Sequence, residues 1–132
     1  MHEVATNNDC PVLTLENGIR VANFSSPHAF TFVSGETLPA CSPERCRRLS
    51  AVPQEVEVSN PRGWTDIELS FELGPDVRAE LERLDVDDDV DVVIAPLPIV
   101  QAARSIGLGR KARTVRMADR VTKVAHSDRF CV

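Results

Sequence analysis

Basic residues gathered in the last third of the sequence give this chain its clearest potential for chemistry. Within the 132 residues, the segment from Val92 to Val132 contains eight basic and two acidic residues, a net charge of +6. Arginine presents a planar fork of N–H donors that matches the oxygens of phosphate groups. The pattern therefore predicts a small site for an anion such as a phosphate or a nucleotide, formed by Arg104, Arg110, Lys111, Arg113 and Arg116.

The same charges allow a second interpretation, in which they neutralise each other. The segment from Val52 to Asp91 contains 13 acidic and three basic residues, a net charge of −10. Opposite charges that face each other set the register of a contact and steer the encounter of two surfaces. The acidic segment of the same molecule, or of a neighbouring protomer in a homo-oligomer, would then lie beside Arg110, Lys111, Arg113, Arg116 and Lys123.

Cysteine, histidine and aspartate side chains could bind a metal or act as nucleophiles, but their arrangement favours neither. Cys41 and Cys46 with His28 and His126 give a poor match to a zinc-binding motif. The acidic run Asp85–Asp89 lacks the glycine and the glutamate of a calcium loop, and no Gly-x-Ser-x-Gly elbow is present. We therefore expect no catalytic residue, no metal and no cofactor, and hence a protein that is not an enzyme.

The composition argues against duplex nucleic acid and membranes as partners. The chain has an isoelectric point near 5.2, and its basic third has no tyrosine or tryptophan to stack on bases. No apolar run approaches the ~18 residues of a membrane-spanning helix. No export signal is visible, so we expect a cytoplasmic protein with free thiols. Trp64 lies in a glycine-containing loop, where it can anchor a protein partner or fold back over a sheet edge.

The clearest structural pattern is a strand followed by a helix, between Val90 and Gly107. β-branched residues run up to Ala95, and a corner with two prolines follows. Pro98 suits a first helical turn, and Gly107 suits the left-handed position after a helix. The segment predicts a strand that packs under a helix, with one apolar stripe at Ile99, Ala102, Ala103 and Ile106.

The rest of the chain predicts strands and one more helix. Asn17-Gly18 predicts a type I′ hairpin turn, and Pro75–Asp85 predicts an amphipathic helix with Glu80 facing water. Alternation from Thr65 to Glu72 predicts a strand with one wet and one covered face, whereas Glu44–Leu49 is interpreted as a loop. Further strands are expected at Val12–Leu15, Ile19–Asn23, Ala29–Val33, Glu55–Val58, Ala112–Met117, Val121–Ala125 and Phe130–Val132.

Together these elements predict one compact α+β domain over residues 1–132. We expect mainly an antiparallel β-sheet with two short helices. Residues 1–10 can form a flexible N-terminal segment.

Three motifs resemble those of short uncharacterised proteins encoded by tailed phages. The segment Asn23-Phe24-Ser25-Ser26-Pro27-His28, followed by an alternating strand, Gly35 and Leu38-Pro39, resembles their N-terminal strand motif of the Asn-Leu-Thr-Pro-His type. The unit Val90–Gly107 resembles their usual second half, and Asp119–Val124 resembles their closing hairpin. The resemblance implies a phage origin and carries no activity with it.

Two functional hypotheses follow. The first is a small binding protein, acting in the host cytoplasm on an anionic small molecule or a host protein. A counter-defence protein that sequesters a nucleotide-type signal would be of this kind. The alternative is a structural subunit of the virion, such as a head decoration or tail accessory protein. The opposite charges of the two halves would then serve contacts between protomers.

Overall fold

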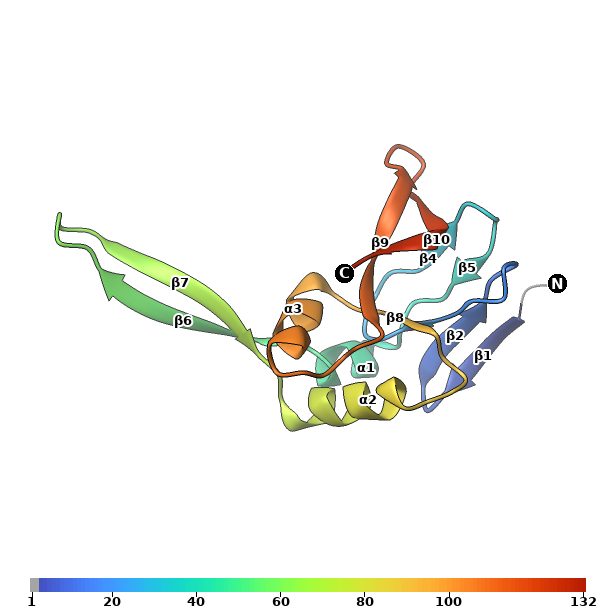
Figure 1. Ribbon diagram of the computed structural model, residues 1–132, viewed down its shortest axis with the longest axis horizontal. Coiled ribbons are helices and arrows are strands. Elements are labelled where there is room, and N and C mark those ends of the chain that lie inside the picture. The colour runs from blue at the N-terminus through green and yellow to red at the C-terminus, as the bar shows by residue number, and fades with distance from the viewer. Residues whose placement is uncertain (1–2) are drawn as a thin grey trace.

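Most strands of the protein belong to one large sheet. The computed structural model describes residues 3–132, and within them eight strands lie in the order β1-β2-β3-β8-β9-β10-β4-β5 (Figure 1). The end strand β5 lies against β2 and β3, so the sheet curls until it nearly closes. The bounds are β1 Glu3–Asn7, β2 Cys10–Thr14, β3 Arg20–Asn23, β4 Phe30–Phe32, β5 Thr37–Leu38, β8 Val92–Ile94, β9 Ala112–Asp119 and β10 Val124–Cys131.

The sheet is mixed, which corrects the expectation of a mainly antiparallel one, although the α+β class is confirmed. Strands β3 and β8, β8 and β9, and β10 and β4 pair in parallel. The predicted strand and helix explain this result. A chain that leaves β8, crosses the sheet through α3 (Leu97–Ser105) and returns must enter β9 in the parallel sense.

Apolar side chains fill both sides of this sheet. The neighbours Val93 and Ile94 on β8 belong to two different clusters of buried residues, because successive side chains of a strand point to opposite faces. Helices α2 (Pro75–Asp85) and α3 cover one cluster, which includes Leu81 and Ile99. The other cluster fills the inside of the curled sheet around Phe32.

The structure has three helices among the described residues, where two were expected. Helix α1 (Pro43–Arg48) corrects the interpretation of Glu44–Leu49 as a loop. The Ser42 hydroxyl accepts a hydrogen bond from the Arg45 N–H at 3.2 Å, and Pro43 occupies the first turn. Helices α2 and α3 confirm the other predictions.

The C-terminal end of α3 has the structure that its sequence predicted. Gly107 adopts a φ of +75°, and the N–H of Leu108 donates to the carbonyl oxygen of Ala103 at 2.9 Å. The N–H of Ile106 reaches the same carbonyl oxygen at 3.1 Å, so carbonyls of the last helical turn are capped by the residues that follow it. The predicted left-handed cap is confirmed.

The hairpin and the C-terminal strands are confirmed in part. Residues 3–7, within the segment 1–10, form β1 and pair with β2, whereas residues 1 and 2 lie outside the described part. The hairpin between β2 and β3 is confirmed, but Gly18 alone has a positive φ in its turn, so the turn is not type I′. At the C-terminus, two predicted strands merge into the single irregular strand β10.

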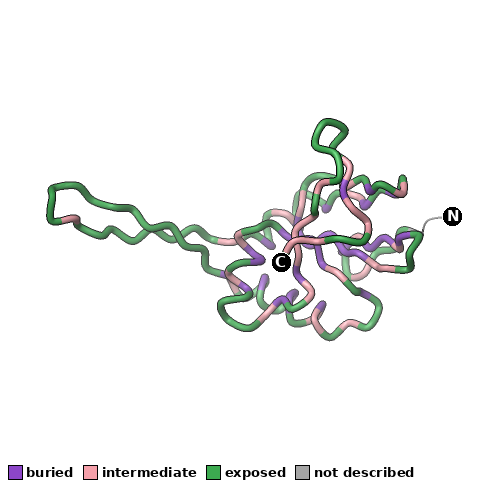
Figure 2. The backbone as a smooth tube through the Cα atoms, turned by 45° about the horizontal axis from the view of Figure 1, so that its top comes forward, coloured by how far each residue is buried: buried purple, intermediate pink, exposed green. Residues whose placement is uncertain are grey.

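A second, two-stranded sheet projects from the body. It consists of β6 (Val52–Ser59) and β7 (Thr65–Glu72), and Figure 1 shows it extending far from the rest of the molecule. Figure 2 shows the same hairpin exposed along its strands. The expectation that one face of β7 is covered is therefore wrong. None of the helices within residues 3–132 is long and apolar enough to cross a membrane.

Candidate functional site

The hairpin β6–β7 carries an unusual distribution of side chains. Residues directly opposite each other in an antiparallel pair share a face. Val58 stands opposite Asp66, and Glu57 stands opposite Ile67. Each face therefore combines an apolar row from one strand with an acidic row from the other. One face carries Val52, Val56 and Val58 beside Asp66, Glu68 and Glu72, and the other carries Ile67, Leu69 and Phe71 beside Glu55 and Glu57.

All 16 residues of the two strands are exposed to solvent. Leu69 has 65% of its surface accessible and Ile67 has 49%. A single two-stranded hairpin is marginally stable in water, and contiguous exposed apolar surface on a protein commonly marks a contact with another molecule. The exposed apolar side chains of the hairpin thus make it the region of this fold best suited to contact another molecule.

The tip of the hairpin is well formed despite its exposure. Gly63 adopts a φ of +105°, and its N–H donates to the carbonyl oxygen of Asn60 at 3.0 Å. Trp64 lies at this tip with half its surface exposed, and its indole Nε1 donates to Asp66 at 3.1 Å. The tryptophan therefore does not fold back over the body, and its side chain is available to a partner.

The hairpin is strongly acidic. From Val52 to Glu72 there are five acidic residues and one basic residue, Arg62, a net charge of −4. No ion pair involves the carboxylates of these strands among the described residues. Their one side-chain bond to a neighbouring strand joins Gln54 Nε2 to Glu72 at 3.2 Å. The negative potential of the hairpin is therefore directed at solvent.

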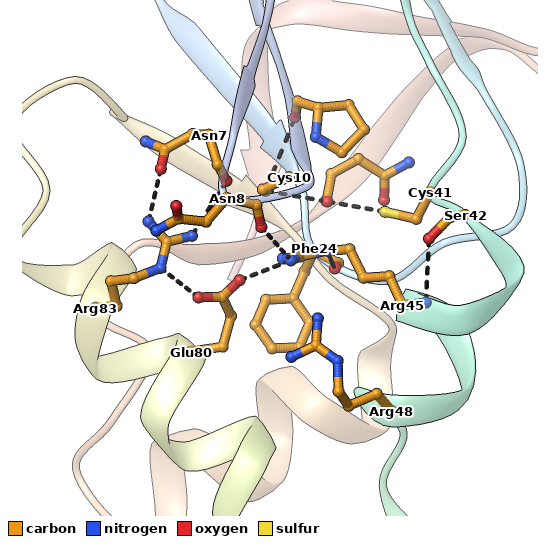
Figure 3. A network of polar contacts seen from close by, with 12 residues as sticks. Asn7, Asn8, Cys10, Phe24, Cys41, Ser42, Arg45, Arg48, Glu80 and Arg83 are labelled. Atoms are coloured by element: carbon orange, nitrogen blue, oxygen red, sulfur yellow. Dashed lines mark hydrogen bonds and ion pairs between the residues drawn. The ribbon is translucent and has the colours of Figure 1, made fainter.

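The two legs of the hairpin are attached to helices that a buried ion pair holds together. Strand β6 follows α1, and β7 leads into α2. Arg45 of α1 donates from Nη1 to a carboxylate oxygen of Glu80 on α2 at 2.7 Å (Figure 3). Arg45 has no exposed surface, and Glu80 keeps only 8%. This contact joins the two helices between which the hairpin lies in the sequence.

The surroundings of Arg45 satisfy most of its donors. Its Nε donates to the carbonyl oxygen of Phe24 at 2.7 Å, and Nη1 also reaches that of Asn8 at 3.3 Å. The guanidinium lies 5.8 Å from the centre of the Phe24 ring, a cation–π distance. Its Nη2 has no hydrogen-bond partner within the described chain. The arginine is thus fixed by α2, the β1–β2 turn and the strand end at Phe24.

Glu80 corrects the prediction that this residue faces water. Burial raises the pKa of its carboxyl, but hydrogen bonds from Arg83 and Arg45 outweigh that effect and hold the pKa below its ordinary value. Arg83 also donates from Nη1 to the Asn7 side chain at 2.7 Å. The helical pattern could not reveal this, because Glu80 is buried by residues distant in sequence. The charged pair was missed for the same reason.

Two buried thiols lie next to this network. Cys10 and Cys41 both donate to the carbonyl oxygen of Asn23, at 3.3 and 3.1 Å. Burial raises the pKa of Cys10 to about 12 and that of Cys41 to about 11. Both are therefore protonated near neutral pH and poorly suited to nucleophilic chemistry. Within residues 3–132, no group of three or more histidine, cysteine, aspartate or glutamate residues could hold a metal ion.

The basic residues predicted to form an anion site are spread over different surroundings. Arg110 donates to the carbonyl oxygen of Asp85 at 2.7 Å, and the Lys111 ammonium donates to those of Asp87 and Val90. These two residues therefore contact the acidic segment of the same molecule, although through main-chain oxygens. This arrangement agrees with the self-complementation interpretation for Arg110 and Lys111.

The other three predicted residues lie on α3 and β9. Arg113 and Arg116 lie three positions apart on β9, so their side chains leave opposite faces of the strand. Arg113 bends back to the carbonyl oxygens of Arg110 and Ala112, and Arg104 is exposed in the last turn of α3. Arg113 and Arg110 are thus in contact, whereas among the described residues no hydrogen bond or ion pair joins Arg104 or Arg116 to the other predicted residues.

Hollows on the surface lie elsewhere. The most voluminous of four, about 530 Å³, lies over β1 and β2 beside Arg20. The guanidinium of Arg20 is already bound to Asp91 at 3.1 Å. None of these four hollows is lined by Arg104, Arg110, Lys111, Arg113 or Arg116.

No family model, curated protein or solved structure matches this chain in comparisons with known proteins.

Proposed function

We propose that this protein is a non-enzymatic binding subunit that acts through the hairpin β6–β7, which another protein chain covers in the functional assembly. One observation carries the proposal: every residue of both strands is exposed, yet each face has a row of large apolar side chains. Apolar burial contributes roughly 25 cal/mol per Å². Covering these rows therefore provides a driving force for association that the free hairpin leaves unused.

Of the two roles suggested by the sequence, the hairpin supports the structural one. A subunit of an assembly needs a large, protruding contact surface, whereas a protein that sequesters a small anion needs a concave site with converging donors. Together with the resemblance to tailed-phage proteins, this leads us to propose a virion subunit, such as a head decoration or tail accessory protein.

The sequestration of a nucleotide-type anion has weaker support. Arg116 and Arg104 are exposed and make no ion pair with described residues, so they could bind an anion. Lys111 and Arg110 are already engaged with carbonyl oxygens. Calorimetric titration with cyclic nucleotides and ADP-ribose derivatives, repeated on Arg116→Glu, tests this role; absence of heat with the unaltered protein would exclude it for those ligands.

A photo-crosslinking experiment tests the proposed role of the hairpin. A photoreactive amino acid replaces Leu69 on the hairpin or, as a matched control, Val86 beyond α2, which has 77% of its surface exposed. Irradiation in the cell that naturally produces the protein should give a covalent adduct of defined mass from position 69 and none from position 86. Equal yields from both positions, or no adduct from position 69, would contradict the proposal.

A further inference from the structure

We infer that the partner of the hairpin β6–β7 is a second copy of this chain, and that the hairpin docks on the basic surface around the β9–β10 turn. This inference rests on the function proposed above and names the partner. We call the receiving region the basic turn surface and define it by Arg116, Arg120, Lys123 and Arg129.

The basic side chains of the basic turn surface have no charged partner among the described residues. All four of its basic side chains are exposed, and within residues 3–132 none of them forms an ion pair or donates a hydrogen bond. Val115 pairs with Phe130 and Met117 pairs with Ala125, so Arg116 lies opposite the irregular stretch of β10 that includes Arg129. With Asp119 and Asp128, which are also exposed in this stretch, the surface keeps a net charge of +2, and none of its carboxylates forms an ion pair with the four basic side chains among the described residues.

Apolar surface accompanies this charge. Val121, between Arg120 and Lys123, has 91% of its surface exposed, the highest value among the exposed large apolar residues. A receiving surface for the hairpin requires both features, because each hairpin face has an apolar row beside an acidic row. The two surfaces thus match in charge and in apolar character.

The two surfaces cannot meet within one molecule. Figure 1 shows β6–β7 leaving the body in one direction and the β9–β10 turn pointing in another. At its base the hairpin lies against α3, through β7. The complementary charges must therefore be satisfied between molecules, as the second interpretation of the sequence allowed.

The charges also select the geometry of the contact. Two hairpins that paired with each other would bring five carboxylates per chain into one interface, which like-charge repulsion opposes. Docking on the basic turn surface instead joins two different patches. The contact gives a two-fold dimer if two copies make it reciprocally, and a ring or a filament if copies join head to tail. The 21 residues from Val52 to Glu72 are about as many as one partner contributes to a standard interface, roughly 20–30.

Two double charge reversals test this pairing. The hairpin variant carries Glu57→Lys and Glu68→Lys, one on each face, and the turn variant carries Arg116→Glu and Arg120→Glu. Arg47→Glu reverses an exposed arginine on α1 and is the matched control. Light scattering coupled to size exclusion measures the mass of each protein, and far-ultraviolet circular dichroism checks that each is folded.

We expect the unaltered protein and Arg47→Glu to form assemblies larger than a monomer at about 0.1 M salt. At about 1 M salt, where screening shortens the Debye length to roughly 3 Å, these assemblies should weaken. Each double variant alone should associate at least about tenfold more weakly. A mixture of the two should assemble again with one of each in alternation, because every contact then joins opposite charges.

Three results would overturn the inference: a monomer at every concentration, a turn variant that assembles like the unaltered protein, or a mixture that fails to reassemble. The crosslinking experiment separates these failures from failure of the proposed function. An adduct from position 69 with the mass of a different protein would retain the hairpin as an interface while excluding the second copy. Loss of both signals would exclude both.

Discussion

The buried contact between Arg45 and Glu80 and the exposed hairpin β6–β7 invert the usual placement of residue types. A charged pair lies inside the body, whereas seven large apolar residues of the hairpin segment lie in water. Charged residues are seldom fully buried unless they are paired, and large exposed apolar surface usually serves a contact. The first region therefore lies within this molecule, and the second is the one that we propose to contact another molecule.

The two regions are also physically connected. The buried pair joins α1 to α2, and these helices flank the two legs of the hairpin. Breaking a buried ion pair by removing one partner leaves an uncompensated charge, which is costly in the interior. The comparison thus predicts large effects on stability from the buried region and small ones from the hairpin.

The largest difference that we expect between the interior and the hairpin is in the rate at which their thiols are labelled. Because burial raises the pKa of Cys10 from 9.0 to about 12, its thiolate fraction near pH 8 is about a thousandfold below that of an ordinary thiol. In contrast, a cysteine placed on the exposed hairpin by Leu69→Cys should react with iodoacetamide in dilute solution at the rate of an ordinary solvent-exposed thiol. Mass spectrometry of peptides measures both rates, and comparable labelling of Cys10 in the folded protein would contradict this assignment.

The buried pair should dominate the stability of the body. Arg45→Ala removes one of the two arginine partners of Glu80 and a donor to the buried carbonyl oxygen of Phe24, so we expect a loss of about 3 kcal/mol in the free energy of unfolding. Urea denaturation measures this loss. Arg48→Ala, in an exposed pair with Glu44 on the same helix, should cost only about 0.3–0.5 kcal/mol. Equal losses of unfolding free energy from the two variants would show that burial does not determine how much the Arg45 contact contributes to stability.

Sequence patterns predicted the local elements well because neighbouring residues determine them. The strand and helix within Val90–Gly107 and the helix Pro75–Asp85 are confirmed. The pair Arg45–Glu80 was beyond prediction, because only the tertiary fold brings the two helices together. The parallel strand pairs were predictable in principle, since the crossover through α3 requires one of them.

The character of the hairpin was also present in the sequence. With Asn60–Trp64 as the connection, the register places Val58 opposite Asp66, so the apolar rows of the two strands fall on different faces. Neither face of the hairpin then presents the uniformly apolar surface that packs into a hydrophobic core. The arrangement of two residues of the predicted anion site was predictable in the same way, since the spacing of Arg113 and Arg116 on one strand sends their side chains to opposite faces.

Paired leucine substitutions sharpen the comparison between body and hairpin. Leu81→Ala removes a side chain of α2 that is 1% exposed and packed in the core, and we expect a loss of about 2–5 kcal/mol. Leu69→Ala removes one that is 65% exposed, and stability should change by no more than about 0.5 kcal/mol in dilute solution. Urea denaturation compares them. A large loss from Leu69→Ala would mean that the hairpin contributes to the fold itself rather than to a contact.

Acid should weaken the body through Glu80. The pKa of this carboxyl in the folded protein lies below its ordinary value of 4.5, although burial raises it, because hydrogen bonds from Arg83 and Arg45 favour the charged form more strongly. The unfolded chain therefore binds a proton first as the pH falls. The stability that this group contributes is fully present above pH 4.5 and is lost as the pH falls through the lower pKa of the folded state.

Urea midpoints measured at several pH values between neutral and strongly acidic check this direction. In Glu80→Gln the side chain cannot titrate, so the protein should be less stable at neutral pH but should lose less stability on acidification. In that variant the free energy of unfolding should still fall with decreasing pH, but with a smaller slope, because a hydrogen bond from Arg20 lowers the pKa of Asp91. If the slope of Glu80→Gln equalled that of the unaltered protein, acid would destabilise the body through other carboxyls. The buried pair would then be only a packing contact at the base of the hairpin.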